Sequence, residues 1–167
     1  MSGIHTSTGG MLARDGLKTA IETALTADDA VDVYAAFQWP ATQPDWVALG
    51  SVTVNADPKT IGPRMQRDET ITLTVNIGSW RVGKGDAVAL AAYERAFALL
   101  VAISDHITAN DKTLGGAVQW CVPGDVDADG EEFEGGYQVE VGPCGHAHAL
   151  LLAQFHADAG GGQTGVL

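Results

Sequence analysis

Basic residues are scarce in this sequence. Its 167 residues include only 9 Lys plus Arg against 21 Asp plus Glu, which gives a formal net charge of −12. A surface with that excess of acid repels phosphate groups, so we expect no specific binding to nucleic acid and no binding to anionic membranes. DNA could still pass such a surface without being held.

Cysteines, a leader segment and long apolar runs are also few or missing. The two cysteines, Cys121 and Cys144, are too few for a disulfide framework and fit a reducing cytoplasm. The N-terminal residues show neither the basic nor the apolar segment of a signal peptide. No uncharged apolar run approaches the roughly 18 residues that span a bilayer. We therefore expect a soluble protein that is made in a cytosol.

Motifs for catalysis are missing as well. The Gly-Lys-Gly segment at residues 83–85 lacks the Ser or Thr that ends a phosphate-binding P-loop, so a tight strand-to-helix turn is the simpler interpretation. Ser104, Asp105 and His106 are the residue types of a hydrolase triad. Consecutive helical residues point about 100° apart, so these three cannot converge. We expect no catalytic residues, no enzyme activity and no cofactor.

One acidic segment contains the ligand types of a calcium site. Residues 125–130, Asp-Val-Asp-Ala-Asp-Gly, match the first half of an EF-hand loop. The bidentate glutamate required at the twelfth position is replaced by Gly136, although Glu131 or Glu132 could supply a ligand in another geometry. A solvated turn is the favoured interpretation, and we expect no tight calcium binding.

A second segment has zinc-ligand types. Cys144, His146 and His148 would share one face of a strand, but their spacing matches no common zinc site and a fourth ligand would have to come from elsewhere. Surface or interface histidines are the favoured interpretation, with zinc as the alternative. We therefore predict no metal site.

Strict alternation at residues 69–80 is the clearest structural signal. Positions 71 to 77 hold Ile, Leu, Val and Ile at the odd numbers, and Thr70, Thr72, Thr74 and Asn76 occupy the even numbers. This pattern predicts a strand with one buried face. Uncharged polar side chains lose less hydration energy than charged ones when they are covered. We therefore expect Thr70, Thr72 and Thr74 to lie near a subunit or partner surface.

The other elements follow from periodicity and from Gly and Pro. Helices are expected at 11–25 and 85–107, the second with Asp86 as its N-cap. Its core-facing stripe is expected to comprise Ala89, Tyr93, Ala96, Leu100, Ile103 and Ile107. Further strands are expected at 31–36, 46–54, 117–122, 137–141 and 147–157, with a long loop at 56–67 and an acidic turn at 123–130. This order predicts an α+β fold, with two helices on one face of a mostly antiparallel sheet of about five to six strands.

The domain organisation is simple. Residues 1–9 are expected to form a flexible N-terminal arm, residues 10–158 a single domain, and the glycine-rich residues 159–167 a disordered tail. The length and the 46% apolar content suffice for one hydrophobic core.

The order of these elements carries a family resemblance over residues 11–158. Its features are the opening helix, the strand at 31–34, the Pro-Asp-Trp-Val-Ala-Leu-Gly segment at 44–50, Arg-Asp-Glu-Thr-Ile-Thr-Leu-Thr-Val at 67–75, the helix at 85–107 and the closing strand. Together they resemble the tail terminator proteins of long-tailed, non-contractile bacteriophages, the lambda-type minor tail protein group.

The resemblance implies a structural virion protein rather than an enzyme. Such proteins form a ring, usually a hexamer, at the head-proximal end of the tail tube, where they end tube polymerisation and dock the head-tail connector (stopper) protein. The implied partners are other copies of the chain, the tail tube protein and the connector, and the implied location is the virion tail, assembled in the host cytoplasm. The alternatives are a connector or tube subunit of the same virion, or a small calcium- or small-molecule-binding α+β module.

A ring on such a tube must let DNA pass without capture. Phosphates are held by Lys and Arg, so acidic or neutral groups suit the channel wall. The candidates for the lumen are Asp125, Asp127, Asp129, Glu131, Glu132 and Glu134, which a hairpin would push away from the sheet. The alternative is that these carboxylates only keep the protein soluble.

Overall fold

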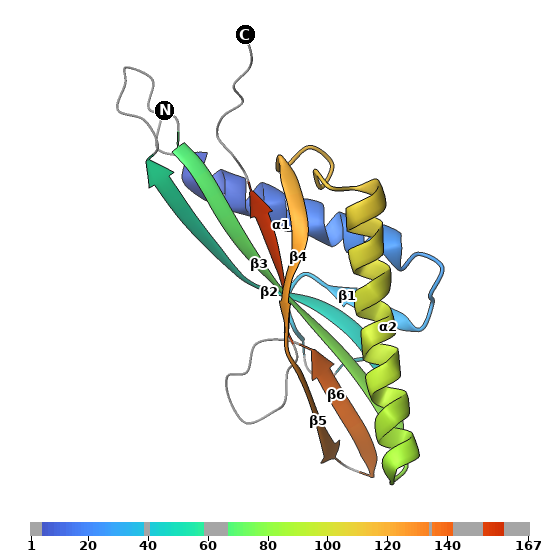
Figure 1. The fold of residues 1–167 in the computed structure, drawn as a ribbon. Coiled ribbons are helices and arrows are strands. Elements are labelled where there is room, and N and C mark those ends of the chain that lie inside the picture. Colours follow the sequence, from blue (N-terminus) through green and yellow to red (C-terminus); the bar gives the residue numbers. More distant parts are fainter. Residues whose placement is uncertain (1–4, 39–40, 59–66, 134, 142–151, 159–167) are drawn as a thin grey trace.

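The structure, a computed structural model, describes residues 5–38, 41–58, 67–133, 135–141 and 152–158, which form an α+β domain (Figure 1). The helices are α1 (His5–Ala24) and α2 (Asp86–Asn110). The strands are β1 (Val31–Tyr34), β2 (Asp45–Pro58), β3 (Arg67–Val82), β4 (Trp120–Val126), β5 (Ala128–Phe133), β6 (Gly136–Val141) and β7 (Leu152–Asp158). The predicted fold class is confirmed.

The seven strands form one sheet in the order β1-β2-β3-β6-β7-β4, with β5 paired to β6. Strand β3 pairs with β7 along residues 70–76 and with β6 along residues 77–82, so β6 and β7 lie end to end beside it. In the same way β4 and β5 follow one another along the far edge, and the sheet is five strands wide. The β1–β2 pair and one β6–β7 bridge are parallel, and all other pairings are antiparallel.

The core lies between the two helices and one face of the sheet. The alternating apolar residues of β3 are Ile71, Leu73, Val75 and Ile77, and all four are buried as predicted. From α2 the buried residues are Ala92, Ala96, Leu99, Leu100, Ile103 and Ile107, and from α1 they include Leu17 and Ile21. The face opposite the helices is called the outward face below.

The helix boundaries differ in part from the prediction. Helix α1 begins at His5, before the expected start at residue 11. Asp86 is the first helical residue of α2 and not its N-cap; Gly85 holds the N-cap position with φ 101°, a conformation that glycine adopts without strain, and no side chain caps the helix. Ala89 and Tyr93 are half-buried, whereas Ala92 and Leu99, which the predicted stripe omitted, are buried.

The predicted acidic turn at 123–130 is wrong, because that segment is extended. Strand β4 runs to Val126 and β5 starts at Ala128. Backbone pairing with β6, from Ala128 opposite Val141 to Phe133 opposite Gly136, keeps β5 extended. The predicted loop at 56–67 is likewise shorter, because β2 extends to Pro58 and β3 begins at Arg67. Residues 147–151 of the last predicted strand lie outside the described residues.

Candidate functional site

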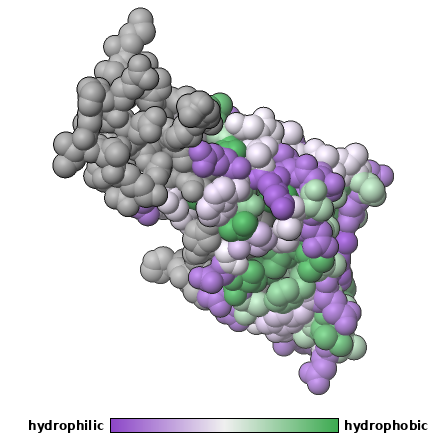
Figure 2. Space-filling model, turned by 45° about the horizontal axis from the view of Figure 1, so that its top comes forward, coloured by the Kyte–Doolittle hydropathy of each residue, from purple (hydrophilic) through white to green (hydrophobic). Residues whose placement is uncertain are grey.

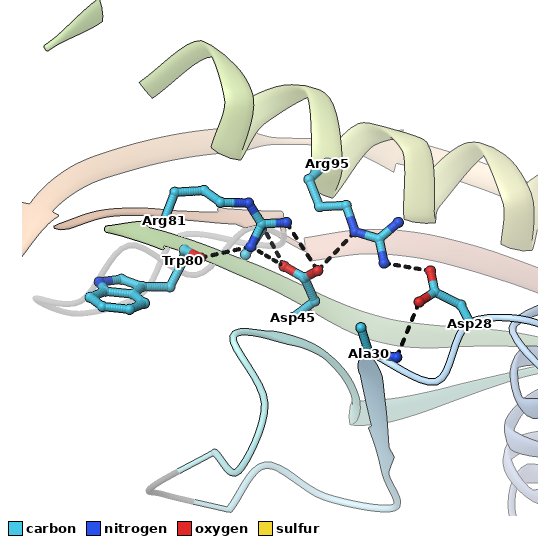
Figure 3. Close-up of polar contacts among 7 residues, drawn as sticks. Asp28, Ala30, Asp45, Trp80, Arg81 and Arg95 are labelled. Carbon is cyan, nitrogen blue, oxygen red and sulfur yellow. Dashed lines mark hydrogen bonds and ion pairs between the residues drawn. The ribbon is translucent and has the colours of Figure 1, made fainter. Parts of the chain in front are cut away.

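A buried carboxylate, that of Asp45 on β2, is the centre of a polar cluster below α2 (Figure 3). Ser79 Oγ donates a hydrogen bond to its Oδ1 over 2.8 Å. The guanidinium of Arg81 contacts both carboxylate oxygens at 2.9 and 3.0 Å, and Arg95 Nε donates to Oδ2 at 2.8 Å. Arg95 also forms an ion pair with Asp28, in the segment between α1 and β1.

These contacts set the charge state of the cluster. Burial by itself raises the pKa of Asp45, but the hydrogen bonds from Arg81, Arg95 and Ser79 outweigh burial, and the pKa lies below its usual value. Burial lowers the pKa of Arg95, and its contacts with Asp45 and Asp28 outweigh that effect and raise it. Two carboxylates thus neutralise two guanidiniums. Through these bonds the cluster links α2, which carries Arg95, to β2 and β3 of the sheet, which carry Asp45, Ser79 and Arg81.

A second feature lies on the outward face, where β2, β3, β7 and β4 run side by side. The strand register creates two rows across this part of the sheet: Asn55, Thr70, Asp158 and Trp120, then Thr53, Thr72, His156 and Val122. Trp120 is 45% exposed and Val122 is 44% exposed. We call the surface formed by Thr53, Asn55, Thr70, Thr72, Trp120 and Val122 the sheet patch.

The three threonines predicted near a partner differ in exposure. Thr70 is exposed and Thr72 is half-buried. Thr74 is only 7% exposed and accepts a hydrogen bond from Ser51 Oγ at 3.1 Å, so it contacts its own chain. Trp120 and Val122 were not among the predicted contact residues, although they alternate with the apolar Cys121 along the segment and so fall on the opposite face of the strand. Cys121 is buried, which raises the pKa of its thiol to about 12.

The acidic residues proposed for a lumen lie on two sides of the β4–β5 edge. Asp125, Asp127, Asp129 and Glu131 are exposed. A side chain at Gly130 would collide with Tyr137 and with Tyr93 of α2, so position 130 faces the helices and its neighbours Asp129 and Glu131 face outward.

Glu132, on the helix side of the same strand, forms an ion pair with Lys84 at 3.8 Å. Glu132 therefore lies on the opposite face of the strand from Asp129 and Glu131. Glu134 lies outside the described residues.

Glu140 on β6 is the most unusual acidic group. It is 4% exposed, its Oε1 accepts a hydrogen bond from Gln138, and its Oε2 is buried without a hydrogen-bond partner. Burial, together with the nearby charge of Glu131, raises its pKa to about 8, although the bond from Gln138 lowers it. At neutral pH this carboxyl group is therefore largely protonated.

The other predicted sites have the following outcomes. The EF-hand-like residues 125–130 lie in the extended β4–β5 edge, and no group of three or more His, Cys, Asp or Glu residues within the described residues is placed to hold a metal. Cys144, His146 and His148 lie outside the described residues. Residues 83–85 form the predicted turn between β3 and α2, and residues 104–106 lie on α2.

No protein-family model matches the chain, and no curated protein matches it. Among solved structures, one match is a chain of the virion of a native gene transfer agent (GTA) particle, with 15% sequence identity and a TM-score of 0.44. The match covers 86% of this chain and 94% of that chain. A likeness at this level is too low to establish a shared fold or function.

Proposed function

We propose that this protein is a structural virion protein that forms a ring at the head-proximal end of a phage tail tube. In that position it would end tube polymerisation and present a docking face to the head-tail connector. The order of elements along the sequence suggests the family. The observation that carries the proposal is the sheet patch, where exposed Trp120 and Val122 continue the rows of Thr70 and Thr72.

The patch has the composition of a contact surface. Tryptophan is enriched in interfaces because it offers a large apolar area and one hydrogen-bond donor, and threonine hydroxyls lose less hydration energy than charged groups. Thr53, Asn55 and Thr70 are also exposed around this apolar pair. In our proposal, the neighbouring subunit or the tube protein covers this patch.

The exposed acidic residues of the β4–β5 edge have a separate place in the proposal. Asp125, Asp127, Asp129 and Glu131 would face the DNA channel, where carboxylates repel phosphates and prevent capture. Glu132 is the weakest candidate of the series, because it lies on the helix side of β5 and forms an exposed ion pair with Lys84. No enzymatic step forms part of this proposal.

Sedimentation velocity over a concentration range tests the proposal. We expect the wild-type chain to associate into a closed oligomer. The family resemblance implies six copies in this oligomer. Thr72→Lys should stay monomeric with an unchanged circular dichroism spectrum, because a lysine in the patch must be dehydrated on contact. The matched control is Thr19→Lys on the exposed side of α1, which should associate like the wild type.

The same experiment separates the alternative functions. A tube subunit would form stacks that grow with concentration, and a small binding module would stay monomeric at every concentration. Normal assembly of Thr72→Lys would contradict the role of the patch.

A further inference from the structure

Helix α2 has a second, exposed face that the core does not use. By length and composition α2 is apolar enough to cross a membrane, a property that the core helices of soluble proteins share. Only 28% of its most apolar 18-residue stretch is buried, however. Leu90 is 58% exposed and Val101 53% exposed, and Phe97 is exposed beside them. Hydrophobic (green) groups gather on the exposed surface in the lower half of Figure 2. The α2 outer face comprises Ala87, Leu90, Ala91, Glu94, Phe97, Ala98, Val101, Ala102 and Asp105, all of them exposed.

The charges on this face limit what can cover it. Its only charged residues are Glu94 and Asp105, and the only Arg or Lys of α2, Arg95, is bound to Asp45 and Asp28. Two copies of α2 packed antiparallel about residue 96, the middle of the face, would bring the Glu94 side chains of the two copies within about one helical turn of each other. Like charges in contact disfavour that symmetric pairing.

The sheet patch offers a better match. Thr53, Thr70 and Thr72 carry hydroxyl donors, and Trp120 carries an indole N–H donor, all suited to carboxylate acceptors. Trp120 and Val122 are exposed apolar groups that can cover Leu90, Phe97 and Val101. The six residues of the patch carry no charge, and in the strand register positions 156 and 158 of β7 stand between β3 and β4.

We infer that the α2 outer face of one copy binds the sheet patch of the next copy. This inference rests on the proposed self-association and specifies its geometry. Because the two surfaces differ, the contact is head-to-tail, and repeated head-to-tail contacts close into a ring when the rotation permits. The occupant of the α2 outer face is therefore a second copy of this chain.

A mixing experiment tests the pairing of the two surfaces. The helix variant carries Leu90→Glu and Val101→Glu, and the sheet variant carries Val122→Glu, with Thr70→Glu as a replacement if Val122→Glu does not fold. Thr19→Glu, outside both surfaces, is the control. Each variant is first checked for native circular dichroism and then studied by sedimentation velocity, alone and in a 1:1 mixture.

We expect the wild type and Thr19→Glu to form the closed oligomer and each variant alone to be monomeric. The mixture should shift to twice the monomer mass and no further, because one intact surface of each kind remains and only one contact can form. A helix or sheet variant that dimerises alone would overturn the head-to-tail pairing, and so would a mixture that stays monomeric while the wild type assembles. A monomeric wild type would instead contradict the proposed function itself.

Discussion

Arg95 and Asp45 are 50 residues apart in sequence, and Arg95 Nε donates a hydrogen bond to Asp45 Oδ2 over 2.8 Å. This contact fixes α2 to β2, and Arg81 and Ser79 complete the shell around the same carboxylate. The polar contacts of this buried acid add to the apolar packing of Ala96, Leu99 and Ile103 that holds α2 against the sheet.

Asp45→Asn should destabilise the fold by about 2–4 kcal/mol, because it leaves two guanidiniums with a single carboxylate. The lower figure of this range allows for water around the partly exposed Arg81 and Arg95, which screens the charges left without a partner. Urea denaturation at pH 7 measures the change in the free energy of unfolding. Glu22→Gln, which removes the exposed ion pair with Lys18, is the control and should cost less than about 1 kcal/mol.

The same variant has a predictable response to acid. The pKa of Asp45 is lower in the folded than in the unfolded chain. The ionised carboxylate therefore contributes its full share of the folding stability above the unfolded-state pKa of about 3.9, and this share is lost as pH falls through the folded-state pKa. The stability gap between wild type and Asp45→Asn should therefore narrow below about pH 4. A gap that stays constant under acid would contradict the assigned ion pairs.

Glu140→Gln should stabilise the protein increasingly as pH rises from 5 to 8. The folded-state pKa is raised to about 8, so the folded chain keeps a proton that the unfolded chain has released. Wild-type stability should then fall relative to the variant by up to about 1.4 kcal/mol per pH unit between the two pKa values. Glu131 and Asp129 lie on the same side of the sheet, and Glu131→Gln should reduce the effect. Parallel pH profiles for wild type and Glu140→Gln would show that Glu140 ionises normally.

The buried face of β3 could be predicted because its cause is local. Ile71, Leu73, Val75 and Ile77 alternate with polar residues, and all four are buried. The extended β4–β5 edge could not be predicted in the same way, because Asp and Gly locally favour turns. What extends β5 is its pairing with β6, and the sequence of residues 123–130 carries no signal for that pairing. The Asp45 cluster depends on contacts across tens of residues, for which single-sequence patterns carry no signal.

Reversal of the exposed acidic edge should create affinity for DNA. The triple variant Asp125→Lys, Asp127→Lys and Asp129→Lys should assemble normally, bind a fluorescent duplex in anisotropy titrations at low salt and release it as salt rises. DNA ejection from particles that carry this variant should be slower. Asp15→Lys, Glu22→Lys and Asp86→Lys, which change the net charge equally, form the control. Equal DNA binding and unchanged ejection in both variants would contradict the lumen assignment.

Calcium should not bind tightly to residues 125–130. The segment lies along a strand edge, and Gly136 replaces the glutamate at the twelfth position. Isothermal titration calorimetry should show no micromolar affinity. A micromolar site that disappears in Asp127→Ala would prove this prediction wrong.

Negative-stain electron microscopy of the purified wild-type protein can show directly whether the chain forms a ring. We expect single rings with a central hole for the wild type, and none for Thr72→Lys under the same conditions. Monomers alone in the wild-type sample would contradict the proposed ring, and long stacked tubes would point to a tube subunit instead.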